Sequence, residues 1–218
     1  MMIKRIPLPL EPDVPSDLRV ASDLPVLRDV ELEGLLFVDV DWAGRSSQGL
    51  ELSESSFRSG ELSEVSLSRC RFRDVVVLDG SWANVEAIDA SFSRVRFERV
   101  RLTGANFSGS TLDSVTFSDC RLDLCSFRLA RLDRVLFDGC NMKEVDLYEA
   151  SLSSATFVDC DLSEATLTHA IFDRSELRGC DLSSIHGPEH LRGVRMPWAD
   201  VIRAAGELAE AAGIEVLE

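Results

Sequence analysis

The sequence predicts an all-β solenoid of about eight coils followed by a C-terminal α-helix, and three observations lead to this fold class. Large apolar residues recur every five positions, small residues stand two positions before them, and the local pattern returns every 20 residues. A chain that turns by about a right angle every five residues keeps its large residues inside, and four such turns close one coil. We therefore expect a four-sided coil of stacked short strands.

The five-residue period extends from Leu32 to Leu182. All 31 positions whose numbers end in 2 or 7 hold Leu, Phe, Trp, Val or Met, except Ser47 and Ala87, and neither exception shifts the register. On an α-helix, at about 100° per residue, these side chains would scatter around the axis. On a straight strand the odd spacing would send them to opposite faces. The period therefore fits neither a continuous α-helix nor a straight strand, and it indicates a chain that turns into a coil.

The 20-residue repeat is clearest in the hexapeptides FSDCRL, FDGCNM and FVDCDL, which begin at Phe117, Phe137 and Phe157. The column through their first residues is mostly Phe. It consists of Phe37, Phe57, Val77, Phe97, Phe117, Phe137, Phe157 and Leu177. Because stacked strands lie roughly 4.8 Å apart, we expect one continuous stack of rings in a solenoid about 37 Å long.

The stretches GANFS, CDLSE and EVDLY, which follow the pattern A(D/N)LxX, resemble the pentapeptide repeat family. The resemblance covers about residues 28 to 185 and implies a right-handed quadrilateral β-helix. We accordingly expect three parts: a proline-rich N-terminal cap over residues 1–27, the repeat solenoid over 28–185, and a C-terminal helix with a tail over 186–218.

The six cysteines all occupy the small position of the repeat, and Cys120, Cys140, Cys160 and Cys180 form one column at 20-residue spacing. Such a column could hold a metal or serve a redox function. However, the sequence has no CxxC, and free Cys packs as a small buried hydrophobe. Side chains that point the same way also have poor disulfide geometry. We expect six reduced, buried thiols without metal.

Catalytic chemistry is not expected. His169, His186 and His190 share no metal-ligand spacing, and the chain has no P-loop, G-x-S-x-G or G-x-G-x-x-G motif. No sequence feature pairs two carboxylates for acid-base work. The sequence therefore predicts a protein that is not an enzyme and has no cofactor.

The two flanks are expected to cover the ends of the solenoid, as solenoids require. Residues 1–27 contain five of the seven prolines, which favours an extended segment whose leucines could lie over the first coil. After HGPEH, a helix should start near Pro197 and stop before Gly213. Its predicted apolar face, opposite Asp200, consists of Trp198, Val201, Ile202, Ala205, Leu208, Ala209 and Ala212.

This helical face has two interpretations. It could plug the end of its own coil, or it could form a twofold dimer interface, for which Trp198, Val201, Ile202, Ala205 and Leu208 are the candidate residues. The resemblance supports the dimer, because relatives that act on DNA topoisomerases use this end in that way. The alternating Ile214, Val216 and Leu217 also predict a short strand in the tail.

Charge limits the partners. The chain has 23 Lys and Arg against 38 Asp and Glu, a net charge of −15, which argues against direct nucleic-acid binding. No apolar run approaches the roughly 20 residues that cross a bilayer. The N-terminus MMIKRIPLPLEP lacks the apolar core of a signal peptide. We expect a cytoplasmic protein with a protein partner and no membrane association.

Two function classes remain. The resemblance implies an acidic, DNA-like rod that binds a type II topoisomerase such as DNA gyrase and protects it, as quinolone-resistance members of the family are understood to do. The alternative is a scaffold or interaction module with an unrelated partner. The expected acidic face consists of Asp119, Asp138, Asp159, Asp161 and Asp181 around one corner of the coil. Residues 61–110, with seven acids and seven bases, do not fit a uniformly charged mimic.

Overall fold

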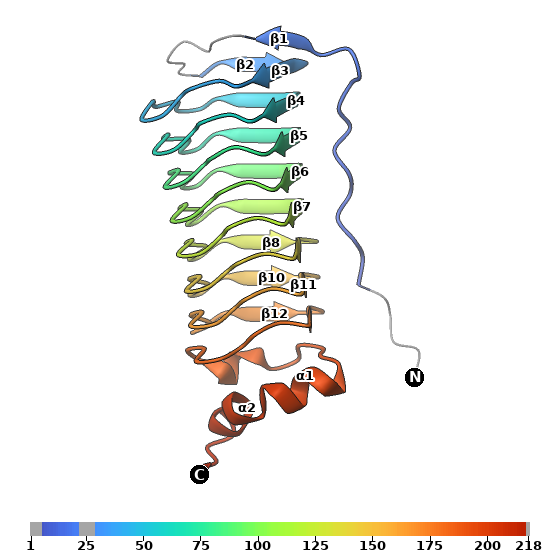
Figure 1. Cartoon of the computed structure of the whole chain (residues 1–218), viewed down its shortest axis with the longest axis vertical. Helices are drawn as coiled ribbons and strands as arrows, with labels where there is room; N and C mark the ends of the chain where they lie inside the picture. The colour runs from blue at the N-terminus through green and yellow to red at the C-terminus, as the bar shows by residue number, and fades with distance from the viewer. Residues whose placement is uncertain (1–5, 22–28, 217–218) are drawn as a thin grey trace.

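The chain folds as a four-sided parallel β-solenoid of about eight coils with a small helical region at its C-terminal end (Figure 1). The computed structural model describes residues 6–21 and 29–216, and in these ranges the predicted fold class is confirmed. The strands are β1 (Arg19–Ala21), β2 (Glu31–Glu33), β3 (Leu35–Val38), β4 (Glu51–Arg58), β5 (Arg71–Leu78), β6 (Ser91–Glu98), β7 (Thr111–Ser118), β8 (Arg131–Asp133), β9 (Leu136–Asp138), β10 (Ser151–Ser153), β11 (Thr156–Val158), β12 (Ile171–Asp173) and β13 (Glu176–Arg178).

The coil of residues 111–130 defines the names of the four faces. Face A lies at residues 111–113, face B at 116–118, face C at 121–123 and face D at 126–128, and each name also applies 20 residues earlier or later. Strands β4 to β7 each run across faces A and B, whereas faces C and D are joined by single bridges such as Arg101↔Arg121. Strand pairings from β2 onward join residues 20 apart.

The corners of the coil explain the five-residue period. Every residue whose number ends in 4 or 9, from Asp29 to Ser184, has a left-handed backbone with φ between 48 and 72°. Most of them are Asp, Glu, Ser, Arg or Gly. Two are Leu124 and Leu129, which are more than half exposed. The sequence predicted that the chain turns, but it did not show which residue makes the turn.

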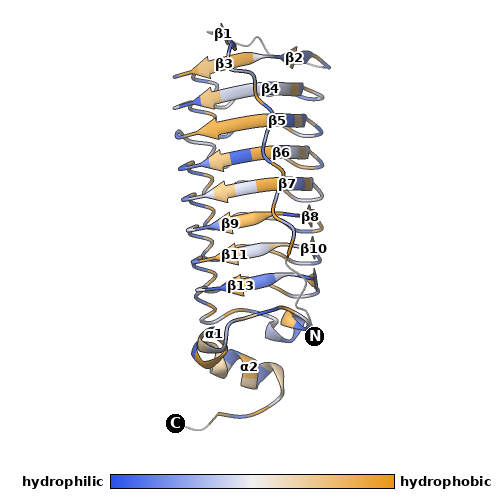
Figure 2. Ribbon diagram, turned by 90° about the vertical axis from the view of Figure 1, so that its right-hand side faces the viewer, coloured by the Kyte–Doolittle hydropathy of each residue, from blue (hydrophilic) through white to orange (hydrophobic). Residues whose placement is uncertain are grey.

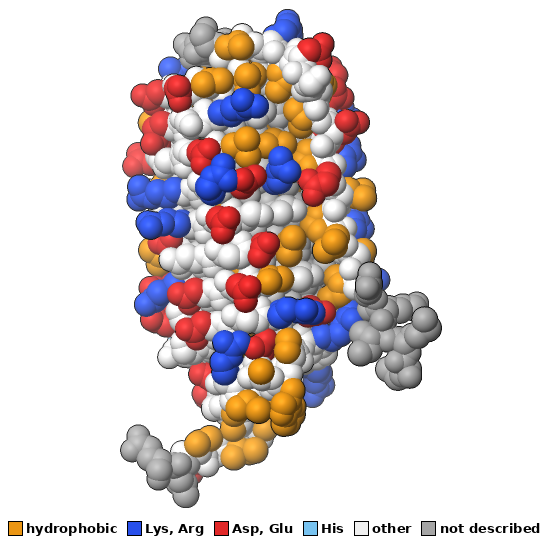
Figure 3. Space-filling model, turned by 45° about the vertical axis from the view of Figure 1, so that its right-hand side comes forward, with side chains coloured by type: hydrophobic (Ala, Val, Ile, Leu, Met, Phe, Trp, Pro, Cys, Tyr) orange, Lys and Arg blue, Asp and Glu red, His pale blue; other side chains and the backbone are white. Residues whose placement is uncertain are grey.

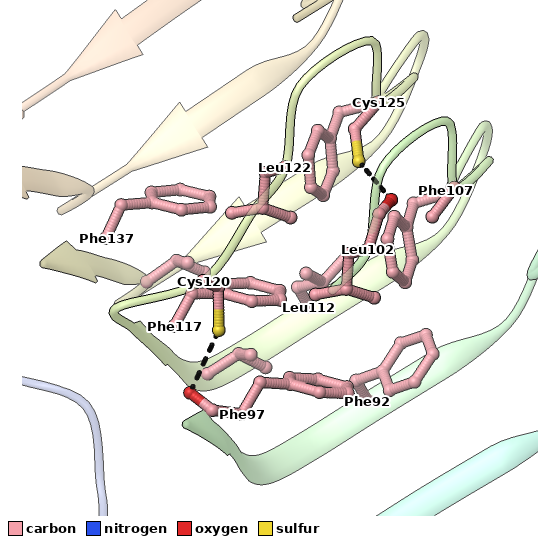
Figure 4. Close-up of a cluster of buried hydrophobic side chains, with 14 of the residues drawn as sticks. Phe92, Phe97, Leu102, Phe107, Leu112, Phe117, Cys120, Leu122, Cys125 and Phe137 are labelled. Carbon is pink, nitrogen blue, oxygen red and sulfur yellow. Dashed lines mark hydrogen bonds between the residues drawn. The ribbon is translucent and has the colours of Figure 1, made fainter. Parts of the chain in front are cut away.

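The interior is a continuous stack of large side chains (Figure 4). Ring centroids are 5.0 Å apart for Phe97 and Phe117, 5.1 Å for Phe117 and Phe137, and 4.8 Å for Phe137 and Phe157. Where Val77 interrupts the column, Trp82 lies edge-on to the rings on either side, 5.6 Å from that of Phe97. The predicted Phe column is therefore confirmed as core.

All six cysteines are free and buried, as predicted. Each thiol donates to a main-chain carbonyl of the preceding coil, for example Cys125 Sγ to Leu102 O at 3.0 Å and Cys120 Sγ to Phe97 O at 3.5 Å (Figure 4). Burial raises the pKa of the Cys125 thiol. The hydrogen bond to the Cys140 thiol, together with burial, raises the pKa of Cys160 to about 12. Most of these thiols therefore stay protonated at neutral pH, which makes them poor nucleophiles.

The N-terminal segment lies differently from the expectation. Residues 6–18, called the strap below, run along the length of the solenoid beside β4 to β7 (Figures 1 and 2). Only β1 joins the first coil, where it pairs with β3 through Arg19↔Leu35. Leu8 and Leu10 are exposed rather than packed over that coil. The expectation that the leucines of this segment cover the end was therefore wrong for these two residues, and Leu24 lies outside the described residues.

The C-terminal region is also more broken than predicted. After a 3-10 turn, η1 (Pro188–Leu191), the helical run divides into α1 (Trp198–Arg203) and α2 (Ala205–Ala211) at Ala204. Asp200, expected on the polar outer face, is buried. Its carboxylate accepts the Gly179 N–H at 2.8 Å and pairs with Arg203. Ile214 and Val216 are exposed and not in a strand, so the predicted tail strand is absent from the described residues.

None of the helices in residues 6–21 and 29–216 combines the length and apolar character that a membrane crossing needs.

Candidate interaction surface

Where the outward residue just before a large core residue is Asp or Asn, its side chain often helps to build the turn that follows. On face C, Asp161 Oδ1 accepts the Ser163 N–H and Asp181 Oδ1 accepts the Ser183 N–H, both at 2.9 Å. Asn141 Oδ1 accepts the Lys143 N–H in the same way at 3.1 Å. Such bonds from a side chain to the backbone two residues on stabilise tight turns. Two of the five predicted acidic residues thus have a structural role in the repeat.

The structure brings three of the predicted acidic residues together. Asp159, Asp161 and Asp181 line one cavity of about 460 Å³ where the last coils meet α1 and α2. Arg203 and Glu207, from the helices, complete its charged lining. Sequence reasoning missed Glu207 at this site because the docking of the helices cannot be inferred from the repeat.

The other two predicted acidic residues lie outside this cavity. Asp119 occupies the corner between faces B and C in the left-handed conformation, and Asp138 is exposed at the end of β9. A Cβ added at Gly139 would lie 2.9 Å from Asp119 Oδ1, which shows that this carboxylate extends over the glycine of the next coil. The predicted acidic face therefore exists as one cluster at the C-terminal end with two separate carboxylates beside it.

Face C carries a symmetrical ladder of charges. Parallel bridges join its outward residues in the order Asp41, Glu61, Ser81, Arg101, Arg121, Asn141, Asp161 and Asp181. Two acids stand at each end and two arginines in the middle. Arg101 and Arg121 are exposed, and within the described residues the structure gives neither side chain an ion pair. Like charges on neighbouring strands repel, so the fold gains nothing from this pair.

The candidate dimer residues divide into two groups. Trp198, Ile202 and Ala205 are exposed, whereas Val201 and Leu208 are half-buried. Leu208 packs against the solenoid core beside the buried Ala204. The helical region therefore caps its own coil with one side and leaves apolar side chains on the other; Figure 3 shows apolar side chains gathered at this end.

Two of the three histidines, His169 and His190, belong to a line of rings on the surface. The His169 ring lies 5.6 Å from that of Tyr148 and 5.3 Å from that of His190, and Arg128 stacks 4.2 Å above the Tyr148 ring. In the part of the chain that the structure describes, no group of three or more His, Cys, Asp or Glu side chains is placed to hold a metal ion.

A parallel β-solenoid that turns at a left-handed residue every five positions defines a class of four-sided repeat solenoids. A family model described as a pentapeptide repeat region matches residues 50–127 and 130–188, more than half of the chain. The chain therefore belongs to the pentapeptide repeat family.

Among solved structures, a trypsin-treated form of QnrB1, described as a plasmid-mediated fluoroquinolone resistance protein, is 20% identical over 91% of this chain and 96% of that chain, with a TM-score of 0.39. HetL, a pentapeptide repeat protein involved in heterocyst differentiation regulation from the cyanobacterium Nostoc sp. strain PCC 7120, is 18% identical over 78% of this chain and 91% of that chain, with a TM-score of 0.30. None of the curated proteins compared with the chain matches it.

Proposed function

We propose that the chain is a non-enzymatic, cytoplasmic interaction protein that binds a protein partner through the outward side chains of its solenoid. The observation that carries this proposal is the pair Arg101 and Arg121. At their position in the repeat, Asp and Asn stabilise the following turn, as Asp161 and Asn141 do. An arginine side chain accepts no hydrogen bond, so neither Arg101 nor Arg121 can make the turn bond. The two positive charges on neighbouring coils also repel each other. Residues that depart from the local sequence preference of a fold without stabilising it are expected at functional positions.

Binding to an extract tests the role of the arginine pair. The immobilised full-length chain is compared with the double variant Arg101→Ser/Arg121→Ser and with Arg131→Ser, an exposed arginine on face A. We expect a protein that the wild type and the Arg131→Ser control retain and the double variant does not. Equal retention by all three chains contradicts the role of this face.

A second candidate function is the acidic mimic of DNA, with a type II topoisomerase as partner. The observation in its favour is the clustering of Asp159, Asp161, Asp181 and Glu207 at the end that carries the exposed apolar helix residues. A twofold dimer through that end would place two acidic clusters next to each other. Arg101 and Arg121 interrupt the acidic line on face C, which makes this candidate the weaker of the two.

A supercoiling assay tests the second candidate. We expect the wild-type chain to change DNA gyrase activity and the triple variant Asp159→Asn/Asp161→Asn/Asp181→Asn to lose the effect, because an amide oxygen keeps the turn bonds and removes the charge. Asp41→Asn is the matched control, since Asp41 makes the same bond, with the Ala43 N–H at 3.1 Å, at the far end of face C. A gyrase that is unaffected by micromolar wild-type chain contradicts the mimic.

A further inference from the structure

The strap lies on an apolar strip that would otherwise face solvent. On face B about half of the outward positions of the coils are aliphatic or threonine, and the strip consists of Leu36, Val76, Leu78, Thr116, Leu136, Thr156 and Val158. Polar and charged residues such as Ser56, Arg96 and Glu98 stand between them. Outward residues on this face are mostly half-buried or exposed, whereas Val76 is only 9% and Ser56 only 4% exposed. Val76 lies in β5, the same strand as Asp74, whose carboxylate accepts a hydrogen bond from the strap residue Asp13 and anchors the strap. The strap therefore covers part of a surface that is suited to an apolar ligand.

Few polar contacts attach the strap. The Asp13 N–H donates to Asp74 Oδ1 at 3.1 Å, and Glu11 Oε2 lies 3.5 Å from Arg96 Nη1. The anchor itself is firm, because Arg94 Nε donates to the same Asp74 Oδ1 at 2.6 Å and Asp74 is buried. These are the polar contacts that the structure describes between the strap and the solenoid.

The sequence of the strap limits its backbone hydrogen bonding to the sheet. Residues 6–18 read IPLPLEPDVPSDL, and the four prolines lack the N–H that would be needed to add a further strand to the sheet. A polyproline-type segment of this length extends about 40 Å, at roughly 3.1 Å per residue, which matches the length of the stacked coils. Its inward side chains, such as Pro9, Pro12 and Val14, are only half-buried, whereas Leu8 and Leu10 face solvent.

The strap also leaves the surface beneath it unsatisfied. Arg96 Nε is buried without a hydrogen-bond partner, on the strand that carries the ion pair with Glu11. A buried donor without an acceptor costs free energy, and an extended segment with a carbonyl at this position would remove that cost. The strap is therefore an incomplete ligand for the surface that it occupies.

We propose that this strip is a docking surface for an extended segment of a partner protein, with prolines, aliphatic side chains and an acidic residue opposite Arg96, and that the strap occupies the surface in cis. The chemistry of the partner is taken from the occupant that the structure shows. The strap lowers the apparent affinity of the chain for this partner, because the partner can bind only the fraction of molecules in which the strip is open. This surface is distinct from face C and from the C-terminal helices.

Full-length variants that release the strap test the proposal. Asp13→Pro removes the donor to Asp74 and suits an extended segment, and Val14→Asp places a charge at a half-buried strap position; the two are combined. The probe is a fluorescent peptide of residues 6–18, followed by anisotropy. We expect the double variant to bind it at least roughly tenfold more tightly than the wild type does. Leu10→Asp, at an exposed strap position, is the control and should bind the probe as weakly as the wild type.

Two further measurements locate the binding. Val76→Glu in the released variant should abolish binding of the probe while the thermal unfolding transition stays cooperative, and a probe carrying Val14→Asp should bind at least roughly tenfold more weakly. Equal binding of the probe by wild type and released variant, absence of binding by both, or binding that survives Val76→Glu overturns the proposal. A wild-type dimer in sedimentation that Val76→Glu dissociates would show that the occupant in trans is a second copy, and would also overturn it.

Discussion

Single residues set the period of this fold through the left-handed corner at every fifth position. Asp, Asn and Gly tolerate this backbone best, and most corners of the chain are polar or glycine. Leu124 and Leu129 adopt it with φ of 60° each while being more than half exposed. Their side chains gain little from burial, so the conformational cost is not offset at these two corners.

This cost leads to the first prediction. Leu124→Asn and Leu129→Asn should each raise the free energy of unfolding by about 0.5–1 kcal/mol, since a left-handed backbone costs a residue such as leucine roughly 1–2 kcal/mol and asparagine less. Denaturant unfolding measures the change, with Leu122→Asn, a substitution in the core, as the strongly destabilised comparison. A loss of stability in both corner variants would show that the leucines contribute contacts that outweigh their backbone strain.

The Phe column gives a second prediction at the residue scale. Phe117 is fully buried and stacks between Phe97 and Phe137, so Phe117→Ala should lower the free energy of unfolding by about 3–5 kcal/mol. The adjacent outward Thr116→Ala should change it by less than about 0.5 kcal/mol. A loss below about 1 kcal/mol for Phe117→Ala would mean that the column is not the main source of stability.

At the scale of one coil, volume is balanced among the four large positions. Ser47 and Ala87 are the two small residues at large positions, and each shares its coil with a tryptophan, Trp42 or Trp82. We infer that the larger indole fills the space that the small residue leaves. The pairing can be found in the sequence, because in both coils the small residue stands at the next large position after the tryptophan. It is missed when Ser47 and Ala87 are treated only as departures from the repeat.

A double-mutant cycle tests this balance. Ala87→Leu alone should destabilise the chain by about 1–3 kcal/mol through overpacking, and Trp82→Leu alone by a similar amount through the cavity that it leaves. The double variant should cost at least about 0.5 kcal/mol less than the sum of the two. Strict additivity in denaturant melts would show that the two positions do not share space.

The attachment of the helices to the solenoid depends on Asp200. The Gly179 N–H and, after it, the Arg203 guanidinium lower the pKa of this carboxyl. Because the folded pKa lies below the unfolded value of about 3.9, the charged group contributes stability above that value and loses it as pH falls through the folded pKa. Asp200→Asn should therefore be about 1–2 kcal/mol less stable than the wild type at pH 7, with a smaller difference near pH 3. Glu210→Gln is the exposed control, and a difference that is independent of pH would contradict the role of the charge.

The solenoid could be predicted from the sequence more completely than its surroundings. The large and small positions repeat, so Phe117, Cys120 and Leu122 each have a place that the period determines. The strap and the helices do not repeat, and their positions depend on single contacts such as Asp13 with Asp74 and Asp200 with Gly179. The acidic cavity could not be predicted for the same reason, since α2 contributes Glu207 to it.

For the whole molecule, the distribution of charge matters more than its sum. A net charge of −15 favours a monomer at low ionic strength, but at physiological salt charges interact only over about 8 Å. The ends of the molecule then determine association. The N-terminal end is extended by β1, whereas the C-terminal end presents the exposed apolar side chains of Trp198, Ile202 and Ile214.

The last prediction is a twofold dimer through this C-terminal end. Trp198 is 76% and Ile202 58% exposed, although α1 already covers the last coil through Asp200 and α2 through Leu208. Apolar side chains that capping leaves exposed fit an isologous contact, in which each helix pair meets its symmetry mate. Ile202→Asp should yield a folded monomer, because a charge buried in an apolar interface is strongly unfavourable. Leu8→Asp, which changes an exposed leucine on the strap, should leave the dimer intact. Sedimentation at micromolar concentration measures both, and a wild type that is already monomeric there contradicts the dimer and the long acidic rod that depends on it.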